Sequence, residues 1–261
     1  MKLVLIKIGG CLITHKNSEM PKINEELMDQ IAGELSEAYK ELKEVSLIII
    51  HGAGSFGHPI VKRTGIHKGI KNHEQLLGFA ETQRLQNELN SIFCNLLIKK
   101  GMPAIPVQAS ASSIMENKRL KSMDIDVIKG LLEVGMVPVL YGVPSYDLEN
   151  KCSILSGDQI MTYLASRLNA KKLIFATDVE GVYSADPKKD KNAVLIERIS
   201  KDNIDKLLLE GSNHTDVTGG MYGKIMEILN LKLKAQIINL SLIHISEPTR
   251  PLYISYAVFC L

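Results

Sequence analysis

Short apolar runs alternate with longer segments of helical periodicity along most of the chain. Apolar residues at successive positions are typical of strands buried on both faces, and they occur at residues 3–8, 46–50, 104–107, 137–141 and 172–176. Helical periodicity covers residues 24–42, 74–99, 125–133, 158–168, 201–209 and 221–233. This alternation predicts an α/β fold with a mainly parallel sheet, whose strands end at one common edge where ligands bind.

Two segments depart from this alternation. Residues 142–156 lack a helical period and are interpreted as a hairpin. Residues 241–261 resemble the translated read-through of a sequencing adapter, although a genuine terminal strand of unusual composition is the alternative. We therefore expect one domain over residues 1–240, followed by a suspected non-native tail at 241–261, and we take no function from that tail.

Composition narrows the functional classes. The 261 residues are 45% hydrophobic and 23% charged, which indicates a packed core. The net charge is +2 with no basic block, which argues against a nucleic-acid stripe or an anionic membrane surface as partner. The four cysteines are scattered without a CxxC pair, which argues against a zinc site and a disulfide scaffold and favours a reduced, cytoplasmic compartment. No run is long and apolar enough to span a bilayer.

The first candidate loop follows the first strand. Gly9 and Gly10 let the backbone approach a ligand closely and leave amides to face phosphate oxygens, and Lys7 adds a cation. The spacing is neither that of a P-loop nor that of a dinucleotide fingerprint. An ordinary Gly-Gly turn beside a solvated lysine is the equally weighted alternative.

The second candidate loop, residues 51–58, follows the second strand and holds three glycines in six positions. Such a loop is rich in open amides, and His58 at its end can donate to a phosphate. His51 lies nearer the buried strand, so we interpret it as a core histidine.

Three further segments stand at strand ends or before helices. Ser156-Gly157-Asp158 opens a helix. The start of a helix stabilises a bound anion, and the alternative is that these residues only cap the helix. Residues 177–187, rich in turn-forming and polar residues, suit a nucleotide-contact loop or a surface hairpin. Residues 216–224 place a Gly pair and Lys224 at the start of a helix. A cation there opposes the helix dipole, which makes a phosphate partner for Lys224 more plausible than solvent.

These five segments, in this order, resemble the amino acid kinase superfamily. The similarity lies in Lys-Ile-Gly-Gly at 7–10, Thr-Asp-Val-Glu-Gly-Val-Tyr-Ser-Ala-Asp-Pro at 177–187 and Thr-Gly-Gly-Met-Tyr-Gly-Lys at 218–224. The resemblance extends to about residue 239 and implies an αβα sandwich around a mainly parallel sheet. It also implies ATP with Mg²⁺ and usually a homodimer, with the substrate phosphate on the N-terminal side and ATP on the C-terminal side.

The resemblance assigns roles residue by residue. Lys7, Gly9, Gly10 and Lys16 match the phosphate-handling start of the family. Gly54 and His58 match the substrate-phosphate loop, in which Ala53 is a further substrate-binding candidate. Gly157 and Asp158 match the loop that organises the centre, and Gly157 is also a substrate-binding candidate. Asp178, Gly220 and Lys224 match the ATP side, to which Lys7, Gly9, Gly10 and Gly54 also contribute. Three departures matter: Cys11 stands where the family usually has Ser, Ala53 replaces a usual Gly, and the C-terminal segment does not match after residue 239.

The resulting hypothesis is phosphoryl transfer from ATP to a small substrate that already carries a phosphate. Lys7, Lys16 and Lys224 would neutralise charge, His58 would bind the substrate phosphate, and Asp158 would orient lysines. No general base is needed, because a phosphate oxygen is already nucleophilic. The acceptor tail should be apolar, and Phe79 is the candidate lining residue.

Two other interpretations stay open. The first keeps the fold but changes the acceptor to an acyl acid, a carbamate or a phosphonate. The carboxylate of an acyl acid would be bound by an arginine, for which Arg63 and Arg84 are available. A nucleotide-binding regulator without turnover is a different class, and the joint presence of Lys7, Lys16, Asp158 and Lys224 argues against it.

Overall fold

The computed structural model describes residues 2–15, 18–41, 44–177, 182–183, 190–196, 198–199, 235–239 and 257–259. The chain forms two compact units, residues 1–170 and 171–261, and each is described by itself. The helices predicted at 201–209 and 221–233 lie outside the described residues.

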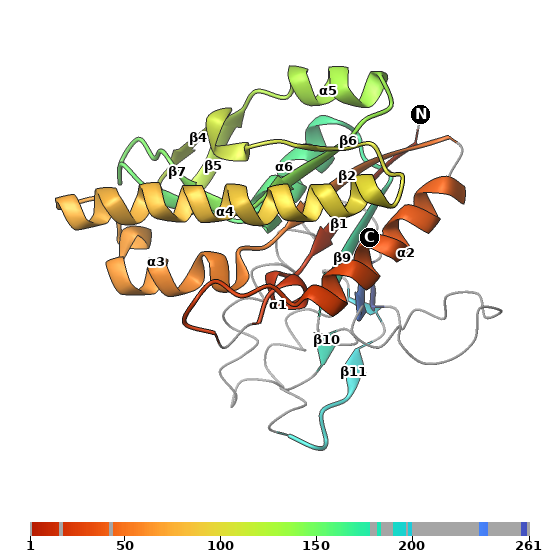
Figure 1. Cartoon of the computed structure of the whole chain (residues 1–261), viewed down its shortest axis with the longest axis horizontal. Coiled ribbons are helices and arrows are strands. Elements are labelled where there is room, and N and C mark those ends of the chain that lie inside the picture. Colours follow the sequence, from red (N-terminus) through yellow and green to blue (C-terminus); the bar gives the residue numbers. More distant parts are fainter. Residues whose placement is uncertain are drawn as a thin grey trace. The chain divides into compact units, whose positions relative to one another are not determined.

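A parallel sheet forms the centre of the first unit (Figure 1). Its strands are β1 (Lys2–Ile8), β2 (Val45–His51), β6 (Val137–Tyr141) and β3 (Ala104–Pro106), in that spatial order. All three neighbouring pairs are parallel, as the apolar runs predicted. The carboxyl ends of β1, β2 and β6 therefore share one edge.

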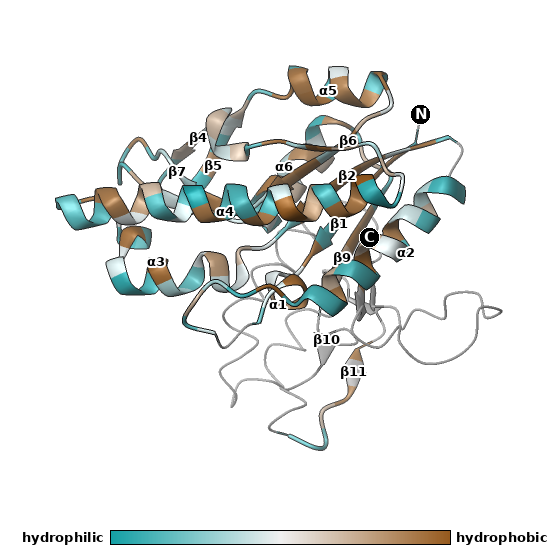
Figure 2. Cartoon of the chain, viewed as in Figure 1, coloured by the Kyte–Doolittle hydropathy of each residue, from teal (hydrophilic) through white to brown (hydrophobic). Residues whose placement is uncertain are grey.

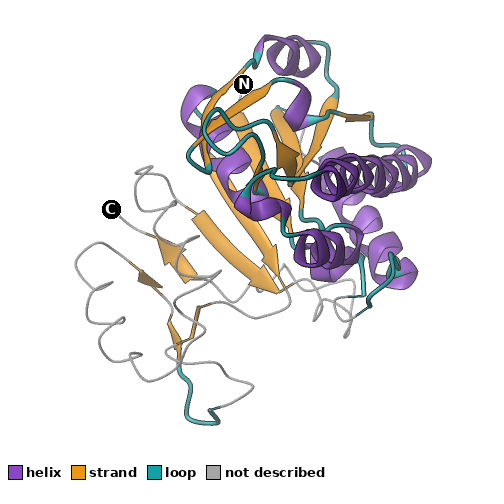
Figure 3. Cartoon of the chain, turned by 90° about the vertical axis from the view of Figure 1, so that its left-hand side faces the viewer, coloured by secondary structure: helices purple, strands orange, loops and turns teal. Residues whose placement is uncertain are grey.

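Helices lie on both faces of this sheet (Figure 3). On one face, α2 (Glu25–Glu41) packs against α4 (His73–Lys99), and α4 in turn contacts β3 and β6. On the other face, α6 (Gly157–Arg167) packs against β1 and β2, while α5 (Asp126–Glu133) packs against β6. The layered α/β arrangement and the predicted helices of this unit are confirmed.

Buried residues of the strands form the core of this unit. Every residue of β2 after Val45 is buried, which matches its Leu-Ile-Ile-Ile centre. Hydrophobic colour concentrates on the strands, whereas α4 carries hydrophobic and hydrophilic residues along its whole length (Figure 2). Burial of these branched side chains favours folding by about 1.5–3 kcal/mol each relative to exposure.

Short elements fill the connections. They are α1 (Gly10–Ile13), α3 (His58–Thr64), the 3₁₀ turns η1 (Gly54–Phe56), η2 (Ile66–Lys68) and η3 (Ala109–Ala111), and two hairpins. The hairpin of β7 (Val143–Ser145) and β8 (Ser153–Leu155) confirms the prediction for residues 142–156. The hairpin of β4 (Ser113–Glu116) and β5 (Arg119–Met123) was not predicted, since its strands are too short for a clear period.

Strands of the second unit also pair with one another. In it β9 (Lys172–Thr177) pairs in parallel with β13 (Ala235–Asn239), and β13 pairs antiparallel with β14 (Ala257–Phe259). The strand β12 (Arg198–Ile199) pairs in parallel with β14, and β10 (Val182–Tyr183) pairs antiparallel with β11 (Leu195–Ile196). In the described part of the chain, no helix has both the length and the apolar character that crossing a membrane requires.

Candidate active site at the carboxyl edge of the sheet

Two glycine-containing loops pack backbone against backbone where β1 and β2 end. A methyl group on Gly10 would lie 2.4 Å from the nitrogen of Gly54 and 2.9 Å from the carbonyl carbon of Gly52. Gly54 has a φ of +50°, in the left-handed region, and a methyl group there would lie 1.9 Å from the Thr14 hydroxyl. Only glycine permits this approach, so both loops present main-chain atoms at the same place.

Thr14 fastens the two loops together. Its hydroxyl donates to the carbonyl of Gly10 at 2.8 Å and accepts from the backbone N–H of Ser55 at 3.0 Å. The backbone N–H of Gly52 donates to the carbonyl of Ile8 at 3.0 Å. These bonds fix the loop after β2 directly on the loop after β1.

A charged pair lies beside these loops. The ammonium group of Lys7, on β1, is 2.8 Å from the carboxylate of Asp158, and the two side chains are 12% and 24% exposed. Gly157 makes room for this lysine, since a methyl group there would lie 3.1 Å from Lys7 Cε. Lys7 is therefore held at the sheet edge while part of the pair remains open to a ligand.

The start of α6 is built in the same place. Ser156 caps the helix by accepting from the N–H of Gln159 at 3.2 Å, which confirms the predicted helix start. Asp158 lies in the first turn, where a carboxylate interacts favourably with the helix dipole. Gly142, which follows β6, donates its N–H to the carbonyl of His51 at 3.0 Å. Three strand ends thus meet around one small region.

The loop after β2 leads directly into α3. Gly57 precedes the helix, whose first residue is His58, and Pro59 occupies the early position that proline favours. The side chain of His58 is exposed. Ala53 has φ −72° and ψ −34°, an ordinary right-handed conformation, so its replacement of glycine does not strain the loop.

His51 is part of the core, as its position after the buried strand indicated. It is 0% exposed, stacks on Tyr141 with ring centroids 5.5 Å apart, and meets Phe93 edge-on. Its Nδ1 lies 3.1 Å from the Gly52 carbonyl, and its Nε2 lies 3.1 Å from Asn90 Oδ1. Burial lowers the pKa of His51 to about 4, even though these two hydrogen bonds act in the opposite direction. The ring is therefore neutral at pH 7.

A buried carboxylate organises the hairpins next to the sheet. Asp147 accepts from the backbone N–H groups of Lys118 at 2.8 Å and of Glu149 and Asn150 at 2.9 Å. Burial alone would raise the pKa of this carboxyl, but these donors outweigh burial and hold the pKa well below its usual range. The β4–β5 turn and the β7–β8 turn are joined through this one side chain.

The structure brings together seven of the predicted site residues. They lie at this edge, at the end of β1, in the segments that follow β1 and β2, or at the start of α6: Lys7, Gly9, Gly10, Ala53, Gly54, Gly157 and Asp158. His58 begins the helix that follows, and Phe79 is half-buried on α4. Lys16, Asp178, Gly220 and Lys224 lie outside the described residues.

Sequence reasoning missed the residues that hold the loops. Thr14, Gln86, Asn90 and Asp147 make side-chain hydrogen bonds to loop backbone or to His51. For Gln86 and Asn90 on α4, the only sign of such a role in the sequence is that they are polar residues on an otherwise apolar helix face. Nothing in the local sequence identifies their partners.

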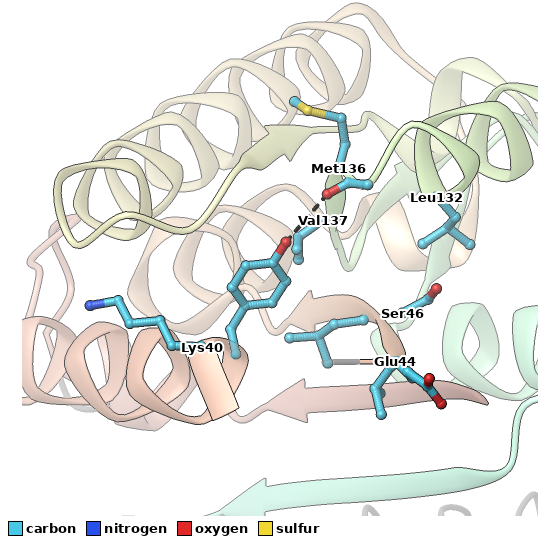
Figure 4. A pocket seen from close by; sticks show the side chains of 10 residues that line it. Lys40, Glu44, Ser46, Leu132, Met136 and Val137 are labelled. Atoms are coloured by element: carbon cyan, nitrogen blue, oxygen red, sulfur yellow. Dashed lines mark hydrogen bonds between the residues drawn. The ribbon is translucent and has the colours of Figure 1, made fainter. Parts of the chain in front are cut away.

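A pocket of about 370 Å³ lies at the opposite, amino edge of the same strands (Figure 4). Its lining comes from the end of α2, the start of β2 and the segment between α5 and β6, and includes Lys40, Glu44, Ser46, Leu132 and Val137. Figure 4 shows Lys40 directed away from the other labelled side chains. No predicted site residue lines this pocket.

The carboxyl edge has the chemistry of an anion site. Main-chain amides of glycine loops and a partly exposed lysine suit phosphate oxygens. Among the described residues, no cluster of three or more His, Cys, Asp or Glu could hold a metal ion by itself.

Comparison with known proteins agrees with this chemistry. The Amino acid kinase family matches residues 2–239. The chain is 42% identical over 247 residues to an isopentenyl phosphate kinase of Methanothermobacter thermautotrophicus, covering 91% of each protein. It is 38% identical to an isopentenyl phosphate kinase of Methanocaldococcus jannaschii, covering 91% of this chain and 90% of that protein. A solved isopentenyl phosphate kinase structure superposes with a TM-score of 0.79 at 37% identity, covering 92% of each chain.

Proposed function

The chain belongs to the amino acid kinase family, and from this premise we propose that it is an isopentenyl phosphate kinase, which transfers the γ-phosphoryl group of ATP to isopentenyl phosphate. The product is isopentenyl diphosphate. One structural observation carries the proposal: the Lys7–Asp158 pair lies beside interlocked glycine loops at the carboxyl edge of the sheet. That arrangement suits two phosphates that must be brought together.

The mechanism follows from the charges. Phosphoryl transfer needs positioning and charge neutralisation more than covalent chemistry. Lys7 supplies a cation for the transferring group, and Asp158 holds that cation in place at 2.8 Å. Amides of the loops after β1 and β2 supply hydrogen bonds to phosphate oxygens. His58 binds the phosphate of the acceptor, whose terminal oxygen attacks without a general base.

The remaining roles rest on the family resemblance. We propose that Lys16 and Lys224 share the neutralisation of charge, and that Asp178 and Gly220 contact ATP. Mg²⁺, carried by the ATP phosphates, would add further neutralisation. Phe79 on α4 is proposed to line the space for the apolar tail. Substitution of the four residues assigned to ATP should raise the KM for ATP. Phe79→Ala should raise the KM for the acceptor.

An acyl-acid acceptor is less well supported. Arg63 and Arg84 were the arginines available to clamp its carboxylate. Arg63 pairs with Glu81 at 3.1 Å and Arg84 pairs with Glu88 at 2.9 Å, and the four side chains are between 45% and 65% exposed. Both arginines are thus engaged on the surface of the helices. A phosphonate acceptor keeps the same phosphate chemistry and is separated from isopentenyl phosphate only by assay.

Assembly and compartment are further proposals. We expect a homodimer, as is usual in the superfamily, and sedimentation of the purified protein would measure it. A reducing cytoplasmic setting suits the cysteines, because Cys94 and Cys152 are buried and burial raises the pKa of each thiol to about 12. Fractionation of the native host would test the compartment.

We also propose that residues 1–240 form the kinase domain and that residues 241–261 are foreign to it. The family match ends at residue 239, which supports this boundary. Chains with and without residues 241–261 should then show the same kcat. A chain that loses activity on truncation would show instead that the strand β14, which lies in this segment, is needed.

The reaction is tested by incubating the protein with Mg-ATP and single acceptors. The panel holds isopentenyl phosphate, dimethylallyl phosphate, fosfomycin, acetylglutamate, carbamate and UMP, with ADP release and product mass as readouts. A diphosphate formed from isopentenyl phosphate with the highest kcat/KM supports the proposal. Preferred turnover of another acceptor overturns the substrate, and ATP binding without any product supports a regulator.

A further inference from the structure

One face of α4 carries polar side chains where the core would accept apolar ones. Thr82, Gln86 and Asn90 stand four residues apart, which places them on one stripe of the helix. Each is no more than 1% exposed. Leu85, Leu89 and Phe93, on the neighbouring stripe, show that this side of the helix faces the core. Burial of amides at these positions is costly unless they are hydrogen-bonded.

Gln86 reaches the substrate loop directly. Its side-chain N–H donates to the carbonyl of Ala53 at 3.3 Å. A methyl group on Gly57 would lie 2.8 Å from Gln86 Nε2 and 2.7 Å from Ala53 Cβ, so the loop closes tightly around this amide. The orientation of the amide is fixed, because the reverse orientation would place its oxygen against the Ala53 carbonyl.

Asn90 makes a second attachment one turn later. Its Oδ1 lies 3.1 Å from His51 Nε2, and its side-chain N–H donates to the carbonyl of Val139 at 3.2 Å. His51 is the last residue of β2 and the first residue of the loop. The two amides of α4 therefore hold both the start of the loop and its middle.

Packing alone does not account for Gln86. Its Oε1 is buried and has no hydrogen-bond partner within the part of the chain that the structure describes. A methionine of similar size would fill the same volume without that unsatisfied oxygen. What Gln86 adds is the one bond to Ala53, and the turn that this bond holds runs through Gly57 into His58.

We infer that Gln86 is a positioning residue for the phosphate acceptor: it holds the Ala53–Gly57 turn so that the loop amides and His58 face the acceptor phosphate. This inference rests on the proposed function of the loop. Gln86 itself is buried beneath the loop and acts through Ala53 and Gly57. Binding of ATP is expected to be unaffected, since the side chain of Gln86 makes its hydrogen bond to the loop after β2 and none to the loop after β1 among the described residues.

The test is Gln86→Met, measured by steady-state kinetics with each substrate varied. We expect the KM for isopentenyl phosphate to rise about tenfold and kcat to fall less, because a loosened loop first weakens acceptor binding. The KM for ATP should stay within about twofold. The melting temperature should be unchanged or higher, because the variant removes a buried oxygen that lacks a partner.

Gln30→Met is the matched control. Gln30 lies on α2, its side-chain N–H donates to Glu34 at 2.9 Å, and its Oε1 is also buried without a partner among the described residues. Its side chain makes no hydrogen bond to the loop after β2 in the described structure. This variant should therefore leave both KM values unchanged.

A second variant and a second readout make the outcome decisive. Gly57→Ala should raise the acceptor KM in the same way, because its methyl group must displace Gln86 or Ala53. Hydrogen exchange of the Gly54 and Gly57 amides should be faster in Gln86→Met than in the wild type. Exchange does not require turnover, so it tests the loop even if the wild type forms no diphosphate and the proposed function fails.

Three results would overturn the inference. One is an unchanged acceptor KM in a folded Gln86→Met protein with unchanged exchange at Gly54 and Gly57. Another is an equal rise in the KM for ATP and for the acceptor, which indicates a general structural role. The third is an effect of Gln30→Met as large as that of Gln86→Met.

Discussion

The two edges of the sheet in the first unit differ, and the presence of an open pocket alone would point to the wrong edge as the active site. The amino edge has an open pocket of about 370 Å³, lined by side chains of mixed character from α2, β2 and β6. The carboxyl edge has loops so close that a methyl group on Gly10 would lie 2.4 Å from Gly54. Yet the ion pair of Lys7 and Asp158 and the glycine amides converge only at the carboxyl edge.

The difference has a simple cause. Parallel strands direct their connecting loops, and hence their main-chain donors, to the carboxyl edge. A site for phosphate needs donors and cations more than it needs a deep apolar cavity. The convergence of cations and main-chain donors is therefore a better guide to this site than the depth of a cavity.

The largest expected effect comes from removing the cation at the carboxyl edge. Lys7→Met should reduce kcat by about 10²–10³-fold, because the transferring phosphoryl group loses a positioned positive charge. Lys40→Met, a lysine at the amino-edge pocket, is the control and should change kcat by less than about twofold. Equal losses in both variants would erase the distinction between the edges.

Next comes the contact between the loops. Gly10→Ala should lower the free energy of unfolding by about 2–4 kcal/mol, because its methyl group meets backbone atoms of Gly52 and Gly54 that cannot move aside. Urea denaturation measures this change. Gly130→Ala on α5 is the control: nothing lies within 4 Å of the added methyl, so stability should rise by about 0.5–1 kcal/mol.

The histidine beneath the carboxyl edge should make stability depend on pH. Burial lowers the pKa of His51 from 6.5 to about 4, so the unfolded chain binds the proton more readily in this range. The free energy of unfolding is therefore unaffected by His51 above pH 6.5. It decreases as the pH falls from 6.5 towards 4, by up to about 3 kcal/mol.

Denaturant titrations at several pH values test this dependence. His51→Gln should show a shallower fall of the unfolding free energy between pH 6.5 and 4, although it is less stable at pH 7. His67→Gln, at an exposed position, should keep the wild-type slope. A slope that survives in His51→Gln would assign the effect to other groups.

The smallest effects are expected away from the carboxyl edge. Ser46 lines the amino-edge pocket and its hydroxyl is buried without a partner among the described residues, so Ser46→Val should be neutral or slightly stabilising. Arg84→Ala breaks only an exposed pair with Glu88, worth about 0.5 kcal/mol or less. Both variants should keep kcat/KM within about twofold. A large loss in Arg84→Ala would revive a carboxylate acceptor.

Much of this division could be predicted from the sequence. Apolar runs placed the four strands of the parallel sheet in the first unit, and strand ends then placed Lys7, Gly10, Gly54 and Asp158 at a common edge, as the structure has them. The helix α3 was missed because its seven residues begin inside a glycine-rich loop and are too few for a clear period.

The hydrogen bonds that hold the loops of the site in place could not be predicted. The hydrogen bonds of Thr14 to Ser55 and of Gln86 to Ala53 join residues far apart in the sequence, and a single chain gives no pattern for such pairs. Nothing in the local sequence distinguishes Asp147 from an ordinary hairpin residue, because the four hydrogen bonds that it accepts depend on two turns meeting in space. The conformation of Ala53 likewise needed the backbone angles.

The central claim is that the phosphate acceptor binds at the carboxyl edge. Titration of ¹⁵N-labelled protein with isopentenyl phosphate tests it, with the amides of Gly54 and Gly57 reporting on the loop and Gly135 reporting on the amino-edge pocket. We predict saturable shifts of Gly54 and Gly57 with no shift of Gly135. Saturable shifts at Gly135 with Gly54 and Gly57 unmoved would contradict the account.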